Sequence, residues 1–341
     1  MFPAHYPKEL LWALDVVPVE IWDPKIEPKL SPTHLQSYIC SVAGLGLELI
    51  LQGKCDAVDG FLFPHTCDSL QNLASVVHDY IGLSKPCYFF YVPKAPYGEA
   101  ARIYYRDRLK LLTAELETRF GRLVPAKLMQ ALERGRRVLA LTTELYKKRA
   151  AGGLACSSME FYRVLRAGEY LHPEDYIPLL EEFSRRAEGN NPKPSLVLSG
   201  VLPNPPELLE FIDELGLRVG NDDFYSCSRR LLGSSPGTGD PFDVLAERFF
   251  SLPPCTTRGA PIKDRADHLV NMVKTGQSVG VIFNIVKFCE AEMFDIPILT
   301  RLLKEEGIPA LVVETELNSG LSGQIRTRVE AFAEMIGLEG P

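Results

Sequence analysis

Residues 57–92 run AVDGFLFPHTCDSLQNLASVVHDYIGLSKPCYFFYV, and this stretch decides the fold class. Its first seven residues, Ala57–Phe63, form a short apolar run bounded by turn residues, which is the pattern of a buried strand. The polar HTCDS that follows leads into an amphipathic segment at 71–82, and Cys87–Val92 has the pattern of a second strand. A strand, a helix and a second strand in this order predict an α/β unit with a parallel sheet.

The C-terminal part of the chain repeats this alternation. Three apolar runs are predicted to be strands: Ser195–Ser199 (SLVLS), Val279–Asn284 (VGVIFN) and Ala310–Glu314 (ALVVE). Between the last two, Phe294–Lys304 is predicted to be a helix with one apolar face that contains Phe294, Ile298, Leu299 and Leu302. A second helix is predicted for the segment GQIRTRVEAFAEMIG near the end of the chain.

The middle of the chain has a different character. From Tyr97 to about Glu188 the sequence consists of long, charged amphipathic segments, which predict helices that pack on something else. The polar stretch Arg186–Pro194 (RAEGNNPKP) is a plausible linker. We therefore predict three regions: a first α/β domain at 1–100, a helical segment at 101–190, and a second α/β domain at 191–341.

Composition excludes several classes of protein. The 341 residues carry a formal charge of −7 without a basic stripe, so we expect no nucleic-acid partner. The N-terminus lacks the basic and apolar regions of a signal peptide, and no apolar run approaches the roughly 18 residues of a membrane helix. We therefore expect a cytoplasmic protein that has no contact with a membrane.

Eight cysteines are spread over the chain and never occur as CxxC, which argues against a zinc ribbon or a ferredoxin-type run. In a protein without a signal peptide they should be reduced, so each is either a small buried hydrophobe or a metal ligand. Cys67 and Cys289 each follow a predicted strand and precede a predicted helix, where a thiolate is stabilised. Cys40 lies in or just before a helix that precedes the first strand. Packing is the commoner role for such cysteines, and spacing alone does not choose.

Several stretches resemble the 2-hydroxyacyl-CoA dehydratase and benzoyl-CoA reductase family in the same order. They are FPAHYPKELLWALDVVPV at the N-terminus, SYIC ending at Cys40, CDAVDGFLFPHTCDSLQNL around Cys67, KFCEAEMFDIPILTRLLKEEGIPALVVETE around Cys289, and GQIRTRVEAFAE. The resemblance spans nearly the whole chain. SYIC and FLFPHTCD are most similar to the smaller, cluster-bearing subunit of benzoyl-CoA reductases. Many members carry a longer N-terminal helical extension, which we expect the neighbouring subunit to supply or the complex to dispense with.

The resemblance implies a fold of two flavodoxin-like α/β domains with parallel sheets flanking the helical segment. It also implies a 4Fe-4S cluster in the cleft between these domains, held by Cys40, Cys67 and Cys289. Three thiolates leave one iron open for another ligand. The implied partners are a homologous second subunit, a cluster-bearing ATPase activator that delivers single low-potential electrons, and an acyl-CoA substrate that is reduced or dehydrated.

Two alternatives remain open at this point. The chain could be an electron-relay subunit without its own substrate site. It could also be a double-cubane reductase of small molecules, with a second cluster held by two or three of Cys156, Cys227 and Cys255, although these lack the strand–Cys–helix setting. Cys55 and Cys87 are expected to be core residues.

Other residues have a functional and a structural interpretation. His65 could donate a proton or a hydrogen bond near Cys67, or be solvated in a loop. Ser41 and Thr66 could donate hydrogen bonds to cluster sulfurs, or cap helices. A further group could orient the cluster or contact CoA phosphates, although a structural carboxylate–arginine pairing is slightly favoured; it comprises Glu314, Glu316, Gln324, Arg326 and Arg328.

Overall fold

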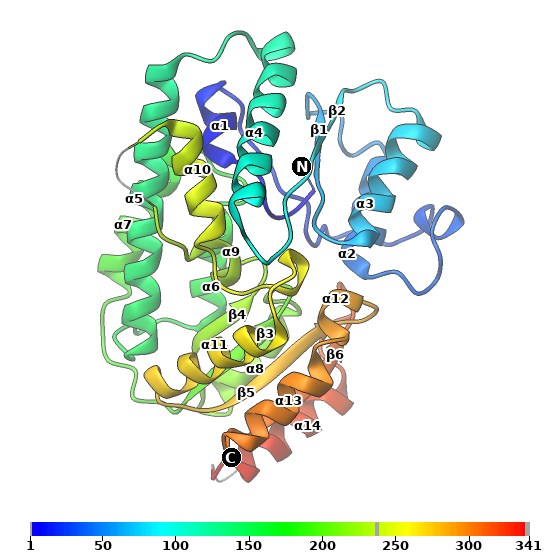
Figure 1. Ribbon diagram of the computed structural model, residues 1–341. Helices are drawn as coiled ribbons and strands as arrows, with labels where there is room; N and C mark the ends of the chain where they lie inside the picture. The colour runs from blue at the N-terminus through cyan, green and yellow to red at the C-terminus, as the bar shows by residue number, and fades with distance from the viewer. Residues whose placement is uncertain (1, 236–238, 338–341) are drawn as a thin grey trace.

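The computed structural model describes residues 2–235 and 239–337. Figure 1 shows an N-terminal α/β part (blue to cyan), a group of long helices, and a C-terminal sheet with its helices (yellow-green to red). Within these described ranges, no helix is both long enough and apolar enough to span a membrane.

The N-terminal part contains a small parallel sheet. Strands β1 (Phe61–Pro64) and β2 (Cys87–Phe90) pair in parallel, with Phe61 opposite Cys87. The preceding elements are α1 (Lys8–Ala13), the short η1 (Ser31–Thr33) and α2 (Ser41–Leu51), and the crossover consists of α3 (Asp68–Ser75) and the π-helical η2 (Val76–Ile81). Parallel strands need a long crossover connection, and here α3 and η2 supply it.

The middle region is helical, as predicted. Its helices are α4 (Glu99–Phe120), α5 (Pro125–Ala150), α6 (Ser158–Ala167) and α7 (Pro173–Arg186). In Figure 1, α4 and α5 form the long helical side of the molecule. Helix α1 packs with α4, α5 and a later helix, α10 (Pro241–Phe250), in one core that includes Leu10, Leu109 and Leu132.

The C-terminal sheet has the strand order β4-β3-β5-β6, with all neighbours parallel. Its strands are β3 (Ser195–Gly200), β4 (Arg218–Phe224), β5 (Ser278–Val286) and β6 (Ala310–Thr315). The remaining helical elements are α8 (Pro206–Glu214), α9 (Ser228–Leu231), η3 (Thr256–Arg258), α11 (Ile262–Thr275), α12 (Glu290–Met293), α13 (Ile296–Glu305) and α14 (Gly323–Met335). This order is the flavodoxin-type arrangement, in which the strand order changes direction between β3 and β5.

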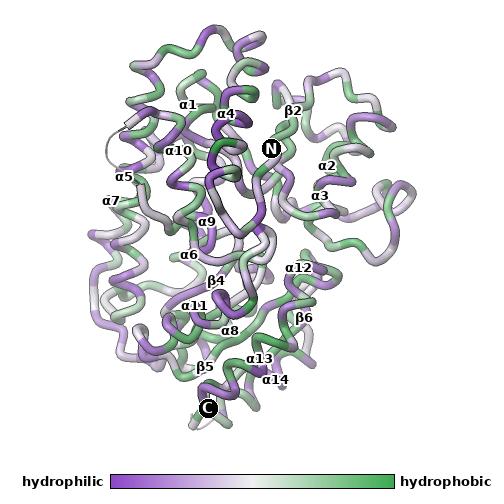
Figure 2. Tube along the Cα trace, viewed as in Figure 1, coloured by the Kyte–Doolittle hydropathy of each residue, from purple (hydrophilic) through white to green (hydrophobic). Residues whose placement is uncertain are grey.

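Both faces of this sheet are covered, which explains its continuous apolar runs. Leu196 and Ile282 point into a core shared with α6, α7, α8 and α14, whereas Val197 and Phe283 point into a core shared with α11 and α13. Figure 2 shows hydrophobic colouring along much of β5. The predicted α/β class, with parallel sheets and many helices, is confirmed; the domain boundaries stay a prediction.

Two details differ from the sequence-based expectation. Strand β4 was not predicted, because its sequence RVGNDDF is polar, yet Asp222 and Asp223 are fully buried. The predicted helix at Phe294–Lys304 begins only at Ile296, and its buried residues are Leu299 and Leu303. Phe294 lies in the turn before α13 and is 75% exposed, so it does not belong to the buried face.

Candidate functional site

Cys40, Cys67 and Cys289 line one small cavity of about 40 Å³. Cys40 is buried, whereas Cys67 and Cys289 are half-buried. The rest of the wall is mostly apolar, with Leu70, Val42, Val201, Val286, Ala291, Pro3 and Trp22, and includes four polar residues, Thr66, Tyr225, Thr257 and Glu292. Three thiols that are distant in sequence therefore meet in one place.

The topology explains why they meet. Each cysteine is the residue immediately before a helix: Cys40 before α2, Cys67 before α3 and Cys289 before α12. Cys67 and Cys289 follow the carboxyl ends of β1 and β5, and Figure 1 shows α12 at the end of the C-terminal sheet that faces α2. In the C-terminal sheet this end lies beside the reversal point between β3 and β5, where α/β proteins bind ligands.

The close approach of β3 and β5 at this point requires a glycine. Gly200 ends β3 with a φ of 151°, and a Cβ atom there would lie 2.1 Å from the carbonyl oxygen of Asn284 in β5. A side chain would therefore push β3 away from β5. Because Gly200 has no side chain, the ends of β3 and β5 lie close enough to place Val201 and Val286 in the same cavity wall.

Burial keeps the three thiols protonated in the absence of a cation. It raises the pKa of Cys67 to about 11 and that of Cys289 well above its ordinary value, with the neighbouring Cys40 sulfur adding to both shifts. Burial likewise raises the pKa of Cys40, while the backbone N–H groups of Ala43 and Val42 act in the opposite direction. A positively charged guest would therefore favour loss of the thiol protons.

The spacing of the thiols disfavours a single metal ion. Among the described residues, no three His, Cys, Asp or Glu side chains lie close enough to chelate one ion. Thiolates on one zinc ion lie about 3.8 Å apart, because each Zn–S bond is about 2.3 Å in a tetrahedral site. In an iron–sulfur cluster each cysteine binds a different iron, so wider spacing is compatible.

A fully buried ionic network supports the segment that contains Cys289. Arg229 pairs with Asp223 (Nε–Oδ1 2.9 Å) and with Glu292 (Nη1–Oε1 2.6 Å). Arg265 pairs with Glu292 (2.6 Å) and with Asp295 (3.1 Å). Burial opposes ionisation of Glu292, but the two guanidinium groups prevail and lower its pKa to about 2. Glu292 lines the cavity, so the network anchors the cavity wall to the C-terminal sheet.

The polar corner of the cavity contains Tyr225, Thr66 and Thr257. Tyr225 is 4% exposed, and its hydroxyl has no hydrogen-bond partner of acceptable geometry among the described residues. Burial and then the Cys255 sulfur raise its pKa well above the usual range, while the nearby Thr257 and Thr66 hydroxyls act against the shift. The phenol is therefore protonated and is a hydrogen-bond donor.

Two cations near the cavity have no carboxylate partner among the residues that the structure describes. The Lys94 ammonium donates to the carbonyl of Thr66 (3.2 Å) and to that of Thr257, and so joins two loops at the cavity. The Arg258 guanidinium is buried and donates to the carbonyls of Phe249 (3.1 Å) and Pro253. Lys94 is exposed, whereas Arg258 is a buried cation without a counter-ion, which is costly and favours an anionic guest nearby.

Of the other predicted site residues near the cysteines, Thr66 alone lines the cavity; its hydroxyl donates to the carbonyl of Pro3 (3.2 Å). His65 is half-buried and packs edge-on against Tyr91 at 5.5 Å, and burial lowers its pKa. Ser41 is the first residue of α2 and is half-buried. His65 and Ser41 are not among the residues of the cavity wall.

The C-terminal group lies elsewhere. Glu314 is exposed on β6, and Gln324 is exposed in the first turn of α14. The guanidinium of Arg326 lies 4.7 Å from the ring centroid of Phe211 in α8. None of these three lines the cysteine cavity, and no ion pair of Glu314 or Arg326 occurs in the described part of the chain.

The remaining cysteines do not gather at a second centre within the described ranges. Cys156 and Cys227 pack with the core between the C-terminal sheet and α5–α8, whereas Cys255 belongs to the core around the cavity. The Cys255 sulfur lies 3.1 Å from the hydroxyl of Thr257. As predicted, Cys55 and Cys87 pack in the N-terminal core.

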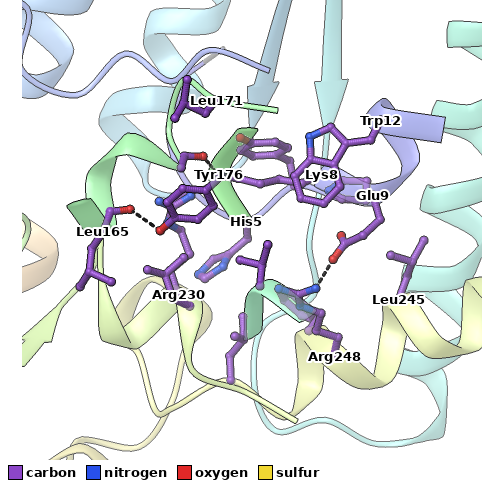
Figure 3. Close-up of a pocket in the computed structure, with 18 of the residues that line it drawn as sticks. His5, Lys8, Glu9, Trp12, Leu165, Leu171, Tyr176, Arg230, Leu245 and Arg248 are labelled. Carbon is purple, nitrogen blue, oxygen red and sulfur yellow. Dashed lines mark hydrogen bonds and ion pairs between the residues drawn. The ribbon is translucent and has the colours of Figure 1, made fainter. Parts of the chain in front are cut away.

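Other hollows lie among the residues that the structure describes. A cavity of about 100 Å³ between the N-terminal segment and α6, α7, α9 and α10 contains His5, whose Nε2 is buried without a partner among the described residues. Figure 3 shows two contacts in this cavity, between Tyr176 and the Leu165 carbonyl and between Arg248 and Glu9. An open groove of about 1120 Å³ is lined by Asp23–Glu27, α6 and the loop after β3, and it contains none of the three cysteines.

Sequence reasoning missed Tyr225, Thr257, Glu292 and Lys94. The one signal for Tyr225 was its place in NDDFYSCSRR, two residues before a cysteine, and this pattern does not distinguish a cavity residue from a core residue. Glu292 follows Cys289 by three residues, but its two arginine partners come from distant segments.

Comparison with known proteins gives a match over almost the entire chain. The family model described as "2-hydroxyglutaryl-CoA dehydratase, D-component" matches residues 3–336. The (R)-phenyllactyl-CoA dehydratase beta subunit of Clostridium sporogenes is 26% identical, over 98% of this chain and 90% of the relative. A benzoyl-CoA reductase subunit of Thauera aromatica is also 26% identical, with the same coverage. The beta subunit of (R)-2-hydroxyglutaryl-CoA dehydratase from Acidaminococcus fermentans is 25% identical, over 98% of this chain and 91% of the relative.

Proposed function

Because the chain belongs to the 2-hydroxyglutaryl-CoA dehydratase D-component family, we propose that it is the iron–sulfur subunit of a radical enzyme that dehydrates or reduces an acyl-CoA thioester. Relatives named as dehydratase and as reductase subunits match it at similar identity, which supports an enzyme subunit of this general type. The observation that carries the proposal is the convergence of Cys40, Cys67 and Cys289 on one cavity.

The donor set fits a 4Fe-4S cluster. Three thiols are the soft ligands that such clusters use, and the apolar wall supplies the low-dielectric surroundings that tune a cluster's potential. The thiols must lose their protons on binding, which positively charged irons drive. Lys94 and Arg258 add positive charge that complements an anionic cluster.

When bound, such a cluster would supply single low-potential electrons for the thioester and would leave one iron without a protein ligand. The protein's own residues hold the site in place. Glu292 and its arginine partners fix the turn that contains Cys289, and Leu70, Val201 and Val286 form part of the apolar cavity wall. We propose that a separate cluster-bearing ATPase delivers the electrons. We also propose that the enzyme contains a homologous second subunit, since the relatives are themselves named as single subunits of dehydratases and of a reductase.

One observation favours the alternative of an electron-relay subunit. Pockets for small molecules usually measure about 300–1,000 Å³, whereas the cysteine cavity measures about 40 Å³. The groove of about 1120 Å³ has the size for a large ligand but contains none of the three cysteines. A titration with benzoyl-CoA and other acyl-CoA thioesters separates the two functions. A change in the cluster spectrum of this chain indicates a substrate site here, and a change in the partner alone indicates a relay.

Iron analysis tests the cluster itself. We expect the anaerobically purified or reconstituted chain to be brown and to contain about four irons. Replacement of Cys40, Cys67 or Cys289 by serine should lower the iron content and remove or alter the absorbance. The matched control is Cys156→Ser, because Cys156 is half-buried but lies outside the cavity. A colourless wild-type chain, or full iron content in all three serine variants, would contradict the proposal. About eight irons would indicate the double-cubane alternative.

A further inference from the structure

The hydroxyl of Tyr225 is a buried hydrogen-bond donor at the cysteine cavity that has no partner among the described residues. The residue is 4% exposed and contributes to the same cavity wall as Cys40, Cys67 and Cys289. Its hydroxyl makes no hydrogen bond of acceptable geometry to any described residue. Buried polar groups in native proteins are nearly always satisfied, so an orphan at a cavity indicates that a guest supplies the acceptor.

The surroundings of Tyr225 prevent the ring from turning its hydroxyl elsewhere. Its backbone N–H donates to the carbonyl of Gly200 (2.9 Å), which ties it to the end of β3. The rings of His5 and Trp22 pack edge-on against it at 5.2 Å and 5.9 Å, and the Arg229 guanidinium lies 6.0 Å from its centroid. The hydroxyl is therefore pre-organised, as expected of a group that binds a ligand.

We propose that Tyr225 donates a hydrogen bond to the oxygen of a ligand that occupies the iron without a protein ligand. The oxygen belongs to a thioester carbonyl or to a water-derived ligand, since both offer a lone pair to a phenol. Because Thr66 and Thr257 lie beside Tyr225, this polar corner distinguishes an oxygen ligand from an apolar one in a cavity whose wall is mostly apolar. The inference rests on the proposed function and names a positioning residue within it.

The test compares wild type, Tyr225→Phe and the control Tyr176→Phe, all loaded with iron. Tyr176 is equally buried, but its hydroxyl donates to the Leu165 carbonyl (2.9 Å) in a different cavity. One arm titrates benzoyl-CoA and its thioether analogue, which lacks the carbonyl, against the electron paramagnetic resonance spectrum of the reduced cluster. The other arm records the coupling of the cluster to ¹⁷O-labelled water.

Removal of one hydrogen bond should weaken binding of the thioester by about tenfold, or remove the ¹⁷O coupling, in Tyr225→Phe alone. The thioether should bind wild type and Tyr225→Phe equally. A response in the thioester arm identifies the carbonyl as the acceptor, and a response in the water arm identifies a solvent-derived ligand. Identical behaviour of wild type and Tyr225→Phe in both arms would overturn the inference.

A stability measurement separates this role from a structural one. Since the hydroxyl has no partner among the described residues, the iron-free Tyr225→Phe chain should unfold at the same temperature as wild type or higher. Tyr176→Phe, which loses a hydrogen bond, should unfold at a lower temperature. A fall of more than about 3 °C for Tyr225→Phe would show that the hydroxyl is structural and would overturn the inference.

Failure of wild type to hold iron would overturn the proposed function, and this inference with it. If both chains hold about four irons and show no difference, only the role of Tyr225 fails.

Discussion

At the cavity, burial opposes the ionisation of two kinds of side chain, but the outcome differs between them. The thiols of Cys40, Cys67 and Cys289 line the cavity, have raised pKa values and carry no charge without iron. Glu292 remains ionised, because Arg229 and Arg265 outweigh the cost of its burial. The turn that contains Cys289 is therefore anchored before iron binds, while the thiols stay in their neutral form. Such an arrangement lowers the cost of ordering the ligands when the cluster is inserted.

Replacement of Glu292 by glutamine tests this anchor. The variant leaves Arg229 and Arg265 buried with less negative charge, so it should lose about 3 kcal/mol of stability. We also expect faster loss of iron, because the turn after Cys289 is no longer held. Denaturant unfolding measures the first effect, and the rate of bleaching by a chelator measures the second.

Glu290→Gln is the matched control, since Glu290 is exposed in the same short helix. It should change stability by no more than about 0.5 kcal/mol. Equal effects of the two substitutions would show that the buried network does not anchor this turn.

Among the elements, α2 has a second role besides presenting Cys40. Glu48 on α2 is fully buried and accepts hydrogen bonds from the backbone N–H groups of Leu30 (2.8 Å) and Ser31 (2.7 Å). Burial acts against its ionisation, but the bonds from Ser31, Gln52 and Leu30 lower the pKa of Glu48 to about 2. The helix thus holds the long loop that leads to its own N-terminus.

This contact should make the loop acid-sensitive. Because the pKa of Glu48 is lower in the folded than in the unfolded chain, its stabilising effect is complete above about pH 4.3. The effect should be lost as pH falls toward 2. We expect hydrogen exchange at the Leu30 and Ser31 amides, corrected for the intrinsic rate, to rise over this range. In Glu48→Gln the exchange should already be faster at neutral pH and should change little with acid; retained acid sensitivity would refute the role of Glu48.

In the whole molecule, the cysteine cavity joins segments from both α/β parts. Cys40 and Cys67 come from the N-terminal part, and Cys289 follows β5 of the C-terminal sheet. A cluster bound by all three would therefore cross-link distant segments of the chain. Its binding free energy would add to the stability of the folded state, by about 2.7 kcal/mol when free ligand exceeds the dissociation constant a hundredfold.

Removal of iron should therefore loosen three helix starts together. We expect hydrogen exchange to increase in the first turns of α2, α3 and α12 at once, with α5 and α14 unchanged, since these do not reach the cavity. Hydrogen-exchange mass spectrometry before and after anaerobic chelation measures this. An increase at only one of the three helices would mean that the cysteines do not share a ligand.

Much of the fold follows from local sequence patterns. The apolar runs at Ala57–Phe63, Ser195–Ser199 and Val279–Asn284 all contain or overlap observed strands, because strands buried on both faces must be apolar along their length. The long charged segments between residues 97 and 188 are helices, as the helical spacing of their apolar residues predicted. The position of Cys67 between a strand and a helix was likewise visible in the sequence.

Tertiary structure decided which residues meet. Strand β4 escaped prediction because Asp222 and Asp223 are polar. Their burial is offset in part by Tyr146, Tyr162 and Arg265 from distant segments. Nearby partners contribute as well, namely Arg229 and the backbone N–H groups of Phe224 and Ser228. The orphan hydroxyl of Tyr225 and the distance of Arg326 from the cavity likewise depend on long-range packing. The periodicity of apolar residues reflects local needs: each segment must form its own backbone hydrogen bonds and bury its apolar face. Contacts between segments depend on how those faces dock, so the sequence by itself determined the elements and the candidate thiols, and the packed fold determined the site.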